Sequence, residues 1–268
     1  MPRHKWIPFV FSSWLQTIVA RYGFFGNYKC WADARKRSGG YDADIIVEKV
    51  KNALLQVKKG AAVYERDSVL FLKIQYSWPL LSAILWIASQ NNNTLRLIDF
   101  GGSMGSSYYQ NRFFLSHLSE LTWSIVEQKA FVDCGKRHFA DDHLKFFYSL
   151  QECLATGPYQ AILFSSVIQY IDKPYELLSE VMDHDFEYIL FDRTPFLIKG
   201  KDRITVQRVP PGIYDASYPA WFFNPEKFLG FMRAKYDLMA DCESNDRANI
   251  RSVFKGFIFR RKKRESGD

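Results

Sequence analysis

The sequence predicts an α/β fold in which a mostly parallel sheet alternates with helices, after an N-terminal helical extension. Three observations support this class. Strand-like and helical stretches alternate from Thr94 onward, a glycine-rich turn follows the first strand, and the residues before 94 have mainly helical periodicity. Strands that alternate with helices build parallel sheets with right-handed crossovers. We therefore expect a helical cap over 1–93, a Rossmann-like domain over 94–262 and a basic tail over 263–268.

Two helices are expected before residue 94. Apolar residues recur at helical spacing from 46 to 57, which predicts a helix over 44–59. A second helix is predicted over 77–89, with Pro79 in its first turn, where the missing N–H removes no helical hydrogen bond. Because this helix is apolar on almost every side, we expect it to be buried.

Seven strands are expected in the Rossmann-like domain, each a short apolar run rich in β-branched or aromatic residues. They fall at 95–100, 123–127, 144–148, 161–165, 188–192, 236–242 and 254–261. The first five would be parallel, and the last two could pair antiparallel. The predicted helices occupy about 106–118, the residues from 129, 174–182, and a segment that opens with Asn224 as its cap and Pro225 in first position.

The stretch 194–223 contains no predicted helix or strand. A loop of that length inside a compact domain usually has a function of its own or hides structure. We therefore expect this insertion to act as a lid over the active site.

The first strand ends at Asp99 and runs into a turn that is rich in glycine. Gly101, Gly102 and Gly105 lie there, with Ser103 between them. In a βα unit this turn lies at the carboxyl edge of the sheet, where ligands bind. Glycine is needed where the backbone approaches a ligand or takes a positive φ. The turn is a candidate ligand-binding loop.

Glu127 ends the second strand and indicates which ligand the loop takes. An acid at this place can accept hydrogen bonds from both ribose hydroxyls of an adenosine group. A solvated glutamate at a strand end is the alternative. Serines at 103 and 106 break the G-x-G-x-x-G pattern of dinucleotide folds, and no G-K-[ST] follows for a phosphate loop. The D-x-G-x-x-x-G pattern instead resembles the first motif of class I methyltransferases.

More of the chain is similar to one family. The sequence resembles bacterial proteins identified as S-adenosylmethionine-dependent methyltransferases, which are often encoded beside genes for surface polysaccharides. The similarity covers about residues 23–259. The motifs that carry it are Gly26-Asn27-Tyr28 with Trp31, Gly40-Tyr41-Asp42, Tyr64-Glu65-Arg66-Asp67, Asp99 to Gln110, Trp123 to Gln128, Phe131-Val132 and Phe164 to Tyr170.

This resemblance implies a class I methyltransferase sheet with S-adenosylmethionine as cofactor. The glycine loop and Asp99 would hold the methionine moiety, and Glu127 with Gln128 the ribose. The end of the third strand, around Leu150, would face the adenine. Ser165 and Ser166 would lie under the sulfonium end, although they could equally cap the next turn. The resemblance also implies a small-molecule or glycan acceptor, here a sugar or glycan intermediate of surface-polysaccharide synthesis.

Methyl transfer to a hydroxyl needs a proton acceptor near the methyl group. Asp192 ends the fifth predicted strand and is our candidate base or substrate binder, with Arg193 beside it as an anchor for an anionic group. A local Asp–Arg ion pair is the alternative. Aromatic residues that could bind the substrate, or could simply pack the core and the lid, are Tyr108, Tyr109, Tyr218 and Trp221.

Composition narrows the classes of function that remain. The 268 residues carry a net charge of +7, but no recognised nucleic-acid module accompanies the charge. Four scattered cysteines and the absence of any H-E-x-x-H pattern predict no metal site. We expect a cytoplasmic protein, with peripheral contact at the inner membrane face through the apolar segment 6–15 as an open alternative.

Three other functions remain open at this stage. The fold could be a catalytically inactive binding or scaffold protein, or an oxidoreductase with a nicotinamide cofactor, although the missing glycine pattern argues against the latter. A methyltransferase that acts on RNA or protein is the third. Salt-sensitive RNA binding would favour an RNA substrate.

Overall fold

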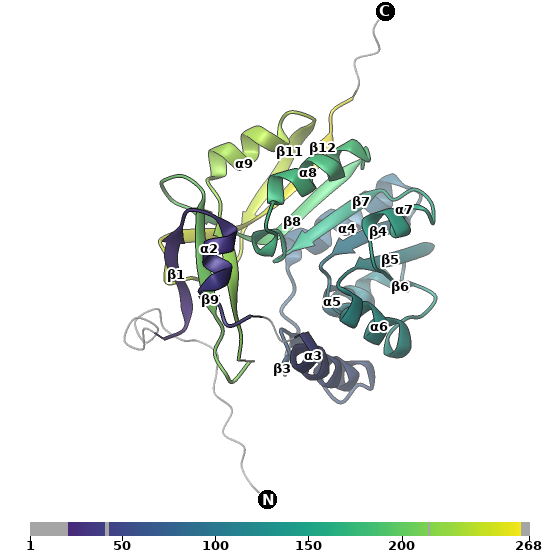
Figure 1. Ribbon diagram of the computed structural model, residues 1–268. Helices are drawn as coiled ribbons and strands as arrows, with labels where there is room; N and C mark the ends of the chain where they lie inside the picture. The colour runs from purple at the N-terminus through teal and green to yellow at the C-terminus, as the bar shows by residue number, and fades with distance from the viewer. Residues whose placement is uncertain (1–20, 41–42, 214, 264–268) are drawn as a thin grey trace, which may run out of the picture.

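The computed structural model describes residues 21–40, 43–213 and 215–263, and Figure 1 shows a large sheet flanked by helices with a smaller sheet beside it. The large sheet has seven strands in the order β11-β12-β8-β7-β4-β5-β6. Their bounds are β4 Thr94–Phe100, β5 Glu120–Val126, β6 Leu144–Phe147, β7 Ala161–Ser165, β8 Tyr188–Leu197, β11 Tyr236–Glu243 and β12 Ser252–Arg261.

The directions of these strands define the fold. Strands β6, β5, β4, β7 and β8 are parallel to their neighbours, whereas β12 is antiparallel to both β8 and β11. This mostly parallel sheet with an antiparallel last strand is Rossmann-like, which confirms the predicted fold class. The strand order reverses beside β4, because β5 lies on one side of it and β7 on the other. Ligands of open α/β sheets bind at such a switch point, beyond the carboxyl ends of the strands.

Helices cover both faces of the sheet, and alternate residues of each strand point to opposite faces. In β4 and β7, Leu97 and Leu163 belong to one buried cluster, and Ile98 and Ile162 to the other. The first cluster includes α4 Trp78–Gln90, α5 Ser106–Leu115 and α6 Lys129–His138. The second includes α7 Leu150–Leu154, α8 Pro174–Asp183 and α9 Pro225–Met232. Asn224 caps α9 as predicted, because its side chain accepts a hydrogen bond from the Lys227 N–H.

The N-terminal part is less uniformly helical than the sequence predicts. Helix α3 Ala43–Lys58 and helix α4 match the two predicted helices, and a short helix α2 Trp31–Lys36 is added. This part also contains three strands that were not predicted, β1 Gly23–Tyr28, β2 Tyr64–Arg66 and β3 Val69–Phe71. The helical cap is therefore a mixed segment. Its strands are too short, and one has too distant a partner, to give a local signal.

The predicted loop 194–223 is also largely structured. Strand β8 continues to Leu197, and β9 Arg203–Arg208 and β10 Ser217–Phe222 follow it. These two strands and β1 form an antiparallel sheet in the order β1-β9-β10, seen beside the large sheet in Figure 1. Ile204 and Val206 alternate in β9 and are buried against α2. The alternation is a strand signal, but only one partner of β9, the next strand β10, is close in sequence, whereas the other, β1, comes from near the N-terminus.

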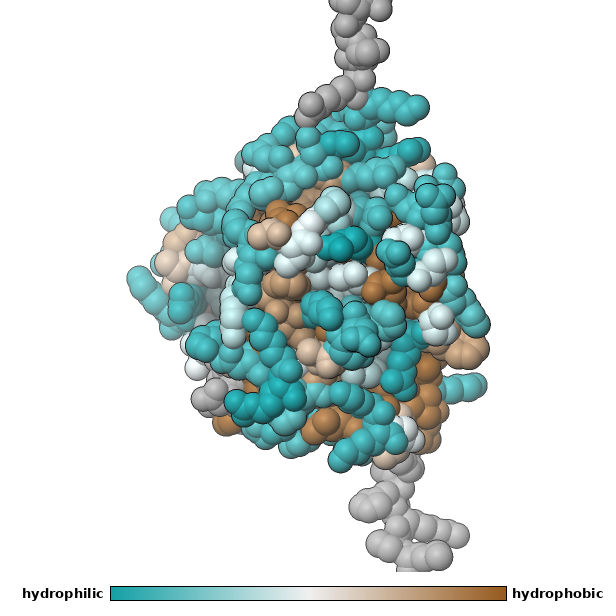
Figure 2. Space-filling view, turned by 90° about the vertical axis from the view of Figure 1, so that its right-hand side faces the viewer, coloured by the Kyte–Doolittle hydropathy of each residue, from teal (hydrophilic) through white to brown (hydrophobic). Residues whose placement is uncertain are grey.

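The surface is mostly polar. Figure 2 shows one hydrophilic face with separate apolar areas, and exposed large apolar residues include Val63, Leu72, Trp78 and Phe113. Among the described residues, no helix is both long and apolar enough to cross a bilayer. The apolar segment 6–15 and the tail from residue 264 onward lie outside the described residues.

Candidate functional site

The glycine-rich turn lies at the switch point, directly after β4. The Gly101 N–H donates to the Val126 carbonyl over 2.8 Å, which ties the turn to the end of β5. Gly101 has φ 68°, and a Cβ there would come within 2.2 Å of Val167 Cγ2. Gly105 has φ 101° and caps α5. Both positions therefore need glycine. Ser103 also takes a left-handed φ of 55°, in a turn that allows little variation.

The side chain of Asp99 packs against the backbone of this turn. Its side chain is fully buried, and its Oδ2 accepts a 3.1 Å hydrogen bond from the Trp123 Nε1–H. A Cβ on Gly102 would lie 2.5 Å from Asp99 Cγ, so the backbone of the turn rests on the carboxyl group. Its Oδ1 has no hydrogen-bond partner. Burial raises the pKa of Asp99 to about 7, and the Trp123 bond opposes this only in part. A buried acceptor without a donor at a ligand loop is a place for a ligand's N–H group.

Glu127 stands at the adjacent strand end. Strands β4 and β5 are in register from Thr94 and Glu120 to Phe100 and Val126, so Gly101 and Glu127 leave the sheet side by side. The Glu127 side chain accepts a hydrogen bond from the Gln128 N–H. Burial raises the pKa of Glu127 to about 7. The second carboxylate oxygen stays available to a ligand hydroxyl.

A bulge in β8 forms the other wall of the site. Phe191 pairs with Phe257 and Thr194 with Lys255, so Asp192 and Arg193 together oppose one residue of β12. Such bulges bend a strand and redirect side chains, often beside active sites. Arg193 has φ 52°, and its Nε lies 3.6 Å from Asp192 Oδ2. The predicted strand end at Asp192 is therefore wrong, because β8 continues through the bulge to Leu197.

Serine hydroxyls join this wall to the rest of the cleft. Ser165 Oγ donates to Asp192 Oδ2 over 3.0 Å, and Ser77 Oγ donates to Oδ1 over 3.2 Å. Ser166 has φ 55°, and its N–H donates to the Asp192 carbonyl. The Asp192 carboxylate therefore has two hydroxyl donors and a guanidinium beside it. This arrangement favours the ion-pair alternative for Asp192 and Arg193 over a free base.

A pocket of about 610 Å³ brings many predicted residues together. It is covered on one side by the small sheet, through Tyr218, and by Trp31 of α2. Of the residues predicted to bind the cofactor or the substrate, the pocket is lined by Asp99, Gly101, Gly102, Ser103, Glu127, Gln128, Ser165, Ser166, Arg193 and Tyr218. One concave surface thus carries both acids, the glycine loop and the strand ends on both sides of the switch point.

A second pocket of about 680 Å³ adjoins the first. The two share the lining residues Arg66, Ser106, Ser107, Ser165 and Arg193. The lining of the second pocket includes the aromatic residues Tyr64, Tyr76 and Trp78 and the polar residues Asn245, Asp246 and Arg247. Two ligands, one in each pocket, would therefore lie next to each other at these shared residues.

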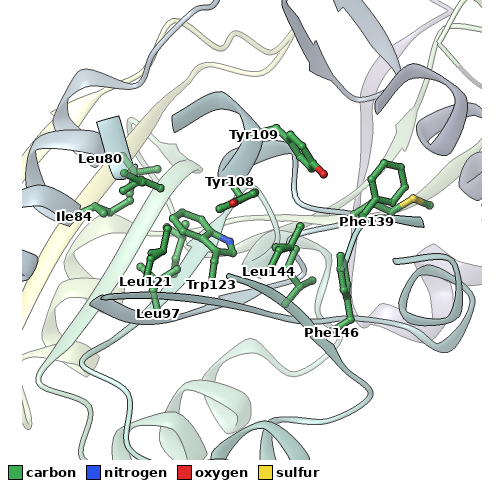
Figure 3. Packing of buried hydrophobic residues seen from close by; sticks show 14 of the residues in the cluster. Leu80, Ile84, Leu97, Tyr108, Tyr109, Leu121, Trp123, Phe139, Leu144 and Phe146 are labelled. Carbon is green, nitrogen blue, oxygen red and sulfur yellow. The ribbon is translucent and has the colours of Figure 1, made fainter. Parts of the chain in front are cut away.

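Two predicted substrate residues lie elsewhere. Tyr108 and Tyr109 are 7% and 5% exposed, and they pack in the core rather than in either of the two adjoining pockets. The ring centroids of Tyr108 and Trp123 are 6.1 Å apart, and those of Tyr109 and Phe139 are 6.2 Å apart. Figure 3 shows these four side chains in the core. Both tyrosines therefore lie outside the two adjoining pockets, and they line a separate pocket of about 550 Å³. Both side chains lie on the face of α5 that packs against the sheet.

Leu150 and Trp221 are also displaced from the pocket lining. Leu150 is 4% exposed and packs in the core beneath β6, so it does not present a surface to an adenine. Trp221 stacks behind Trp31 at 6.2 Å between ring centroids, and its Nε1–H donates to the Ile171 carbonyl. It supports a lining residue and does not line the pocket itself. Sequence spacing alone does not show in which direction the side chains of Leu150 and Trp221 point.

The structure adds two site residues that the sequence prediction left out. Glu65 and Arg66 of β2 line the first pocket, and Glu65 is 1% exposed. Their signal was present, because the motif Tyr64-Glu65-Arg66-Asp67 is part of the family resemblance. A charged run ahead of the sheet nevertheless looks like a solvated loop until β2 is placed against α5, which it contacts.

Among the described residues no three His, Cys, Asp or Glu side chains are grouped as metal ligands would be. The four cysteines are unpaired thiols, of which Cys30 is exposed and Cys153 buried.

No protein-family model matches the sequence, and no curated protein matches it significantly. Several solved structures are similar to this chain at low identity. Magnesium protoporphyrin IX methyltransferase from Synechocystis PCC 6803 with bound S-adenosylhomocysteine is 12% identical, with a TM-score of 0.48, over 82% of this chain and 100% of that one.

Two further structures are similar at the same level. The 1,6-didemethyltoxoflavin-N1-methyltransferase of Burkholderia thailandensis is 9% identical, with a TM-score of 0.42, over 84% of this chain and 92% of that one. The N-terminal domain of EvdMO1, solved with S-adenosylhomocysteine and D-fucose, is 12% identical, with a TM-score of 0.46, over 83% and 98%. The fold of this chain is assigned from its own strand order and directions.

Proposed function

We propose that this protein is an S-adenosylmethionine-dependent methyltransferase. The cofactor's ribose would bind Glu127, and its methionine moiety would lie along the turn from Gly101 to Gly105. The observation that carries this proposal is the joint presence of Gly101 to Ser103, Asp99 and Glu127 in one pocket, at the switch point of a class I methyltransferase sheet. The family resemblance of the same residues supports it.

The residues fit such a cofactor. The turn lacks side chains where a Cβ would collide with Val167 or Asp99, so its backbone can approach a ligand closely. The unpartnered Asp99 Oδ1 offers an acceptor to the ammonium of an amino acid moiety. Glu127 offers an acceptor to ribose hydroxyls from a position one strand away.

When bound, this cofactor supplies a methyl group on a sulfonium for in-line displacement. The chain's part is alignment and water exclusion. Ser165 and Arg193 line both pockets, so an acceptor in the second pocket would meet the cofactor's methyl group where the two pockets adjoin. Asp192 would orient the acceptor's hydroxyl through Ser77 and Ser165, to which it is hydrogen-bonded.

For the acceptor we propose a sugar or glycan intermediate of surface-polysaccharide synthesis. The second pocket supports this class because aromatic residues and amide, carboxylate and guanidinium groups line it together. Rings pack on the C–H face of a sugar, and polar side chains fix its hydroxyl groups. The resemblance to proteins encoded beside polysaccharide genes supports the same class.

Calorimetry with S-adenosylhomocysteine tests the cofactor assignment. We expect micromolar binding to the wild type, about −8 kcal/mol. The Glu127→Ala variant should bind about 10- to 100-fold more weakly, because charge-assisted hydrogen bonds to the ribose are lost. The matched control is Glu120→Ala at the opposite, exposed end of the same strand, which should bind like the wild type.

A folded wild type that binds no S-adenosylhomocysteine would overturn the proposal and leave a binding or scaffold module as the better interpretation. Equal weakening in both variants would remove Glu127 from the ribose site. Titration with a nicotinamide dinucleotide in the same instrument tests the oxidoreductase alternative, and salt-dependent RNA binding tests an RNA substrate.

A further inference from the structure

The β2–β3 hairpin is fastened to the start of α5. Glu65 Oε2 accepts a 2.6 Å hydrogen bond from Ser106 Oγ, and Oε1 accepts a 2.7 Å bond from the Ser68 N–H. Ser106 is the first residue of α5, directly after the glycine turn. Because Glu65 is buried, these bonds are shielded from water and hold the hairpin against the cofactor pocket. The next residue on the hairpin is Arg66.

Arg66 is a half-buried cation without an anionic partner. It lines both pockets, and its guanidinium carbon lies 5.8 Å from the centre of the Phe71 ring. No ion pair among the described residues includes it. A guanidinium in a cleft is built for bidentate contact with a carboxylate. Its uncompensated charge therefore points to an anionic ligand group.

The other two arginines of the first pocket fit this role less well. Arg193 is already beside Asp192, at 3.6 Å from Nε to Oδ2. Arg35 is exposed and lies on α2, which packs on β9 and β10 of the small sheet, whereas β2 contacts α5. Arg66 alone of the three combines partial burial, a free charge and a direct connection to the helix that follows the turn.

We propose that Arg66 binds the carboxylate of the cofactor's methionine moiety. This inference rests on the proposed function. The moiety carries an ammonium and a carboxylate, and the pocket offers one complement to each, the unpartnered Asp99 Oδ1 and the unpaired Arg66 guanidinium. Glu65 is then a positioning residue, because it fixes the hairpin that carries Arg66 through Ser106.

The test compares two ligands by calorimetry. S-adenosylhomocysteine has the carboxylate, and decarboxylated S-adenosylhomocysteine keeps the amine and the thioether but lacks it. The wild type should prefer the intact ligand. Arg66→Met should weaken the intact ligand about 10- to 100-fold, the range of a charge-assisted hydrogen bond, and leave the decarboxylated ligand unchanged. Unchanged binding of that second ligand also shows that the variant is folded.

The controls separate this inference from the cofactor assignment. Arg35→Met should keep the wild-type preference for the carboxylate, and Arg66→Lys should keep part of it. Equal loss of both ligands in Arg66→Met, an unchanged preference there, or loss of preference in Arg35→Met instead would overturn the role of Arg66. If the wild type binds neither ligand, the proposed function itself fails, and that result is visible before any variant is measured.

Discussion

Replacement of Asp99 by asparagine should make the folded protein more stable in alkaline solution while weakening its ligand binding. Asp99 is fully buried with one oxygen unpartnered, and its pKa is raised from 3.8 to about 7 by burial. Between these values the folded chain keeps a proton that the unfolded chain has lost. Ionisation therefore opposes folding, and the free energy of unfolding falls as the pH rises through this window and levels off above it.

The size of the effect follows from the two pKa values. The interval corresponds to about 4 kcal/mol at about 1.4 kcal/mol per pH unit. At pH 5 only about 1.5 kcal/mol of this opposes folding, and at pH 8 all of it does. Asparagine keeps an acceptor for the Trp123 Nε1–H but places an unpartnered N–H₂ group where Oδ1 was. This buried donor lowers the free energy of unfolding by about 1–2 kcal/mol. The net gain is about 2–3 kcal/mol at pH 8 and about zero at pH 5.

Urea denaturation of wild type and Asp99→Asn at both pH values measures this difference. Asp237→Asn on the exposed side of β11 is the matched control, and its stability relative to the wild type should be the same at pH 5 and pH 8. A stability change that is the same at both pH values, or a variant that is less stable at pH 8, would refute the reasoning. Calorimetry on the same samples should show weaker S-adenosylhomocysteine binding, because the ligand ammonium loses its carboxylate.

Three further substitutions test the packing around the site. Gly101→Ala should lower the free energy of unfolding by about 1–3 kcal/mol and remove S-adenosylhomocysteine binding, because the added Cβ would collide with Val167. Gly212→Ala is the control and should change neither, because a Cβ there meets no atom. Asn224→Ala should lower the free energy of unfolding, measured by thermal denaturation, by about 1 kcal/mol because the α9 cap is lost. An unchanged stability would show that the cap hydrogen bond does not stabilise the fold. Asp192→Asn should destabilise the fold by roughly 2–4 kcal/mol because Arg193 loses its partner. Intact stability with lost turnover would instead favour a direct part in the reaction.

The large sheet could be predicted because its signals are local. Each strand from β4 to β8 is a short apolar run beside its own helix, and predicted strand 161–165 coincides with β7. The glycine turn and Glu127 follow from the same pattern, since parallel strands end at one edge. The strand at 188–192 was too short because the bulge at Asp192 and Arg193 interrupts the alternation that a strand otherwise shows.

Other parts depend on contacts between distant segments. Strand β9 pairs with the next strand, β10, but also with β1 near the N-terminus, so only one of its two pairings is local. Side-chain direction was the second difficulty. Tyr108 and Tyr109 follow the turn closely in sequence, yet their helix turns them into the core. Arg66 was missed because nothing in its own segment shows that the hairpin meets α5.

The pairing of β1 with β9 also sets an order of events during synthesis. Gly23 pairs with Arg208, so the first strand leaves the ribosome long before its partner exists. At about 5–20 residues per second, the delay is about 10–40 s. Strands β4 to β7 can associate during that interval, while the cover over the cleft cannot close. A nascent chain would therefore expose its ligand cleft to solvent first, and the small sheet that covers the cleft would form last.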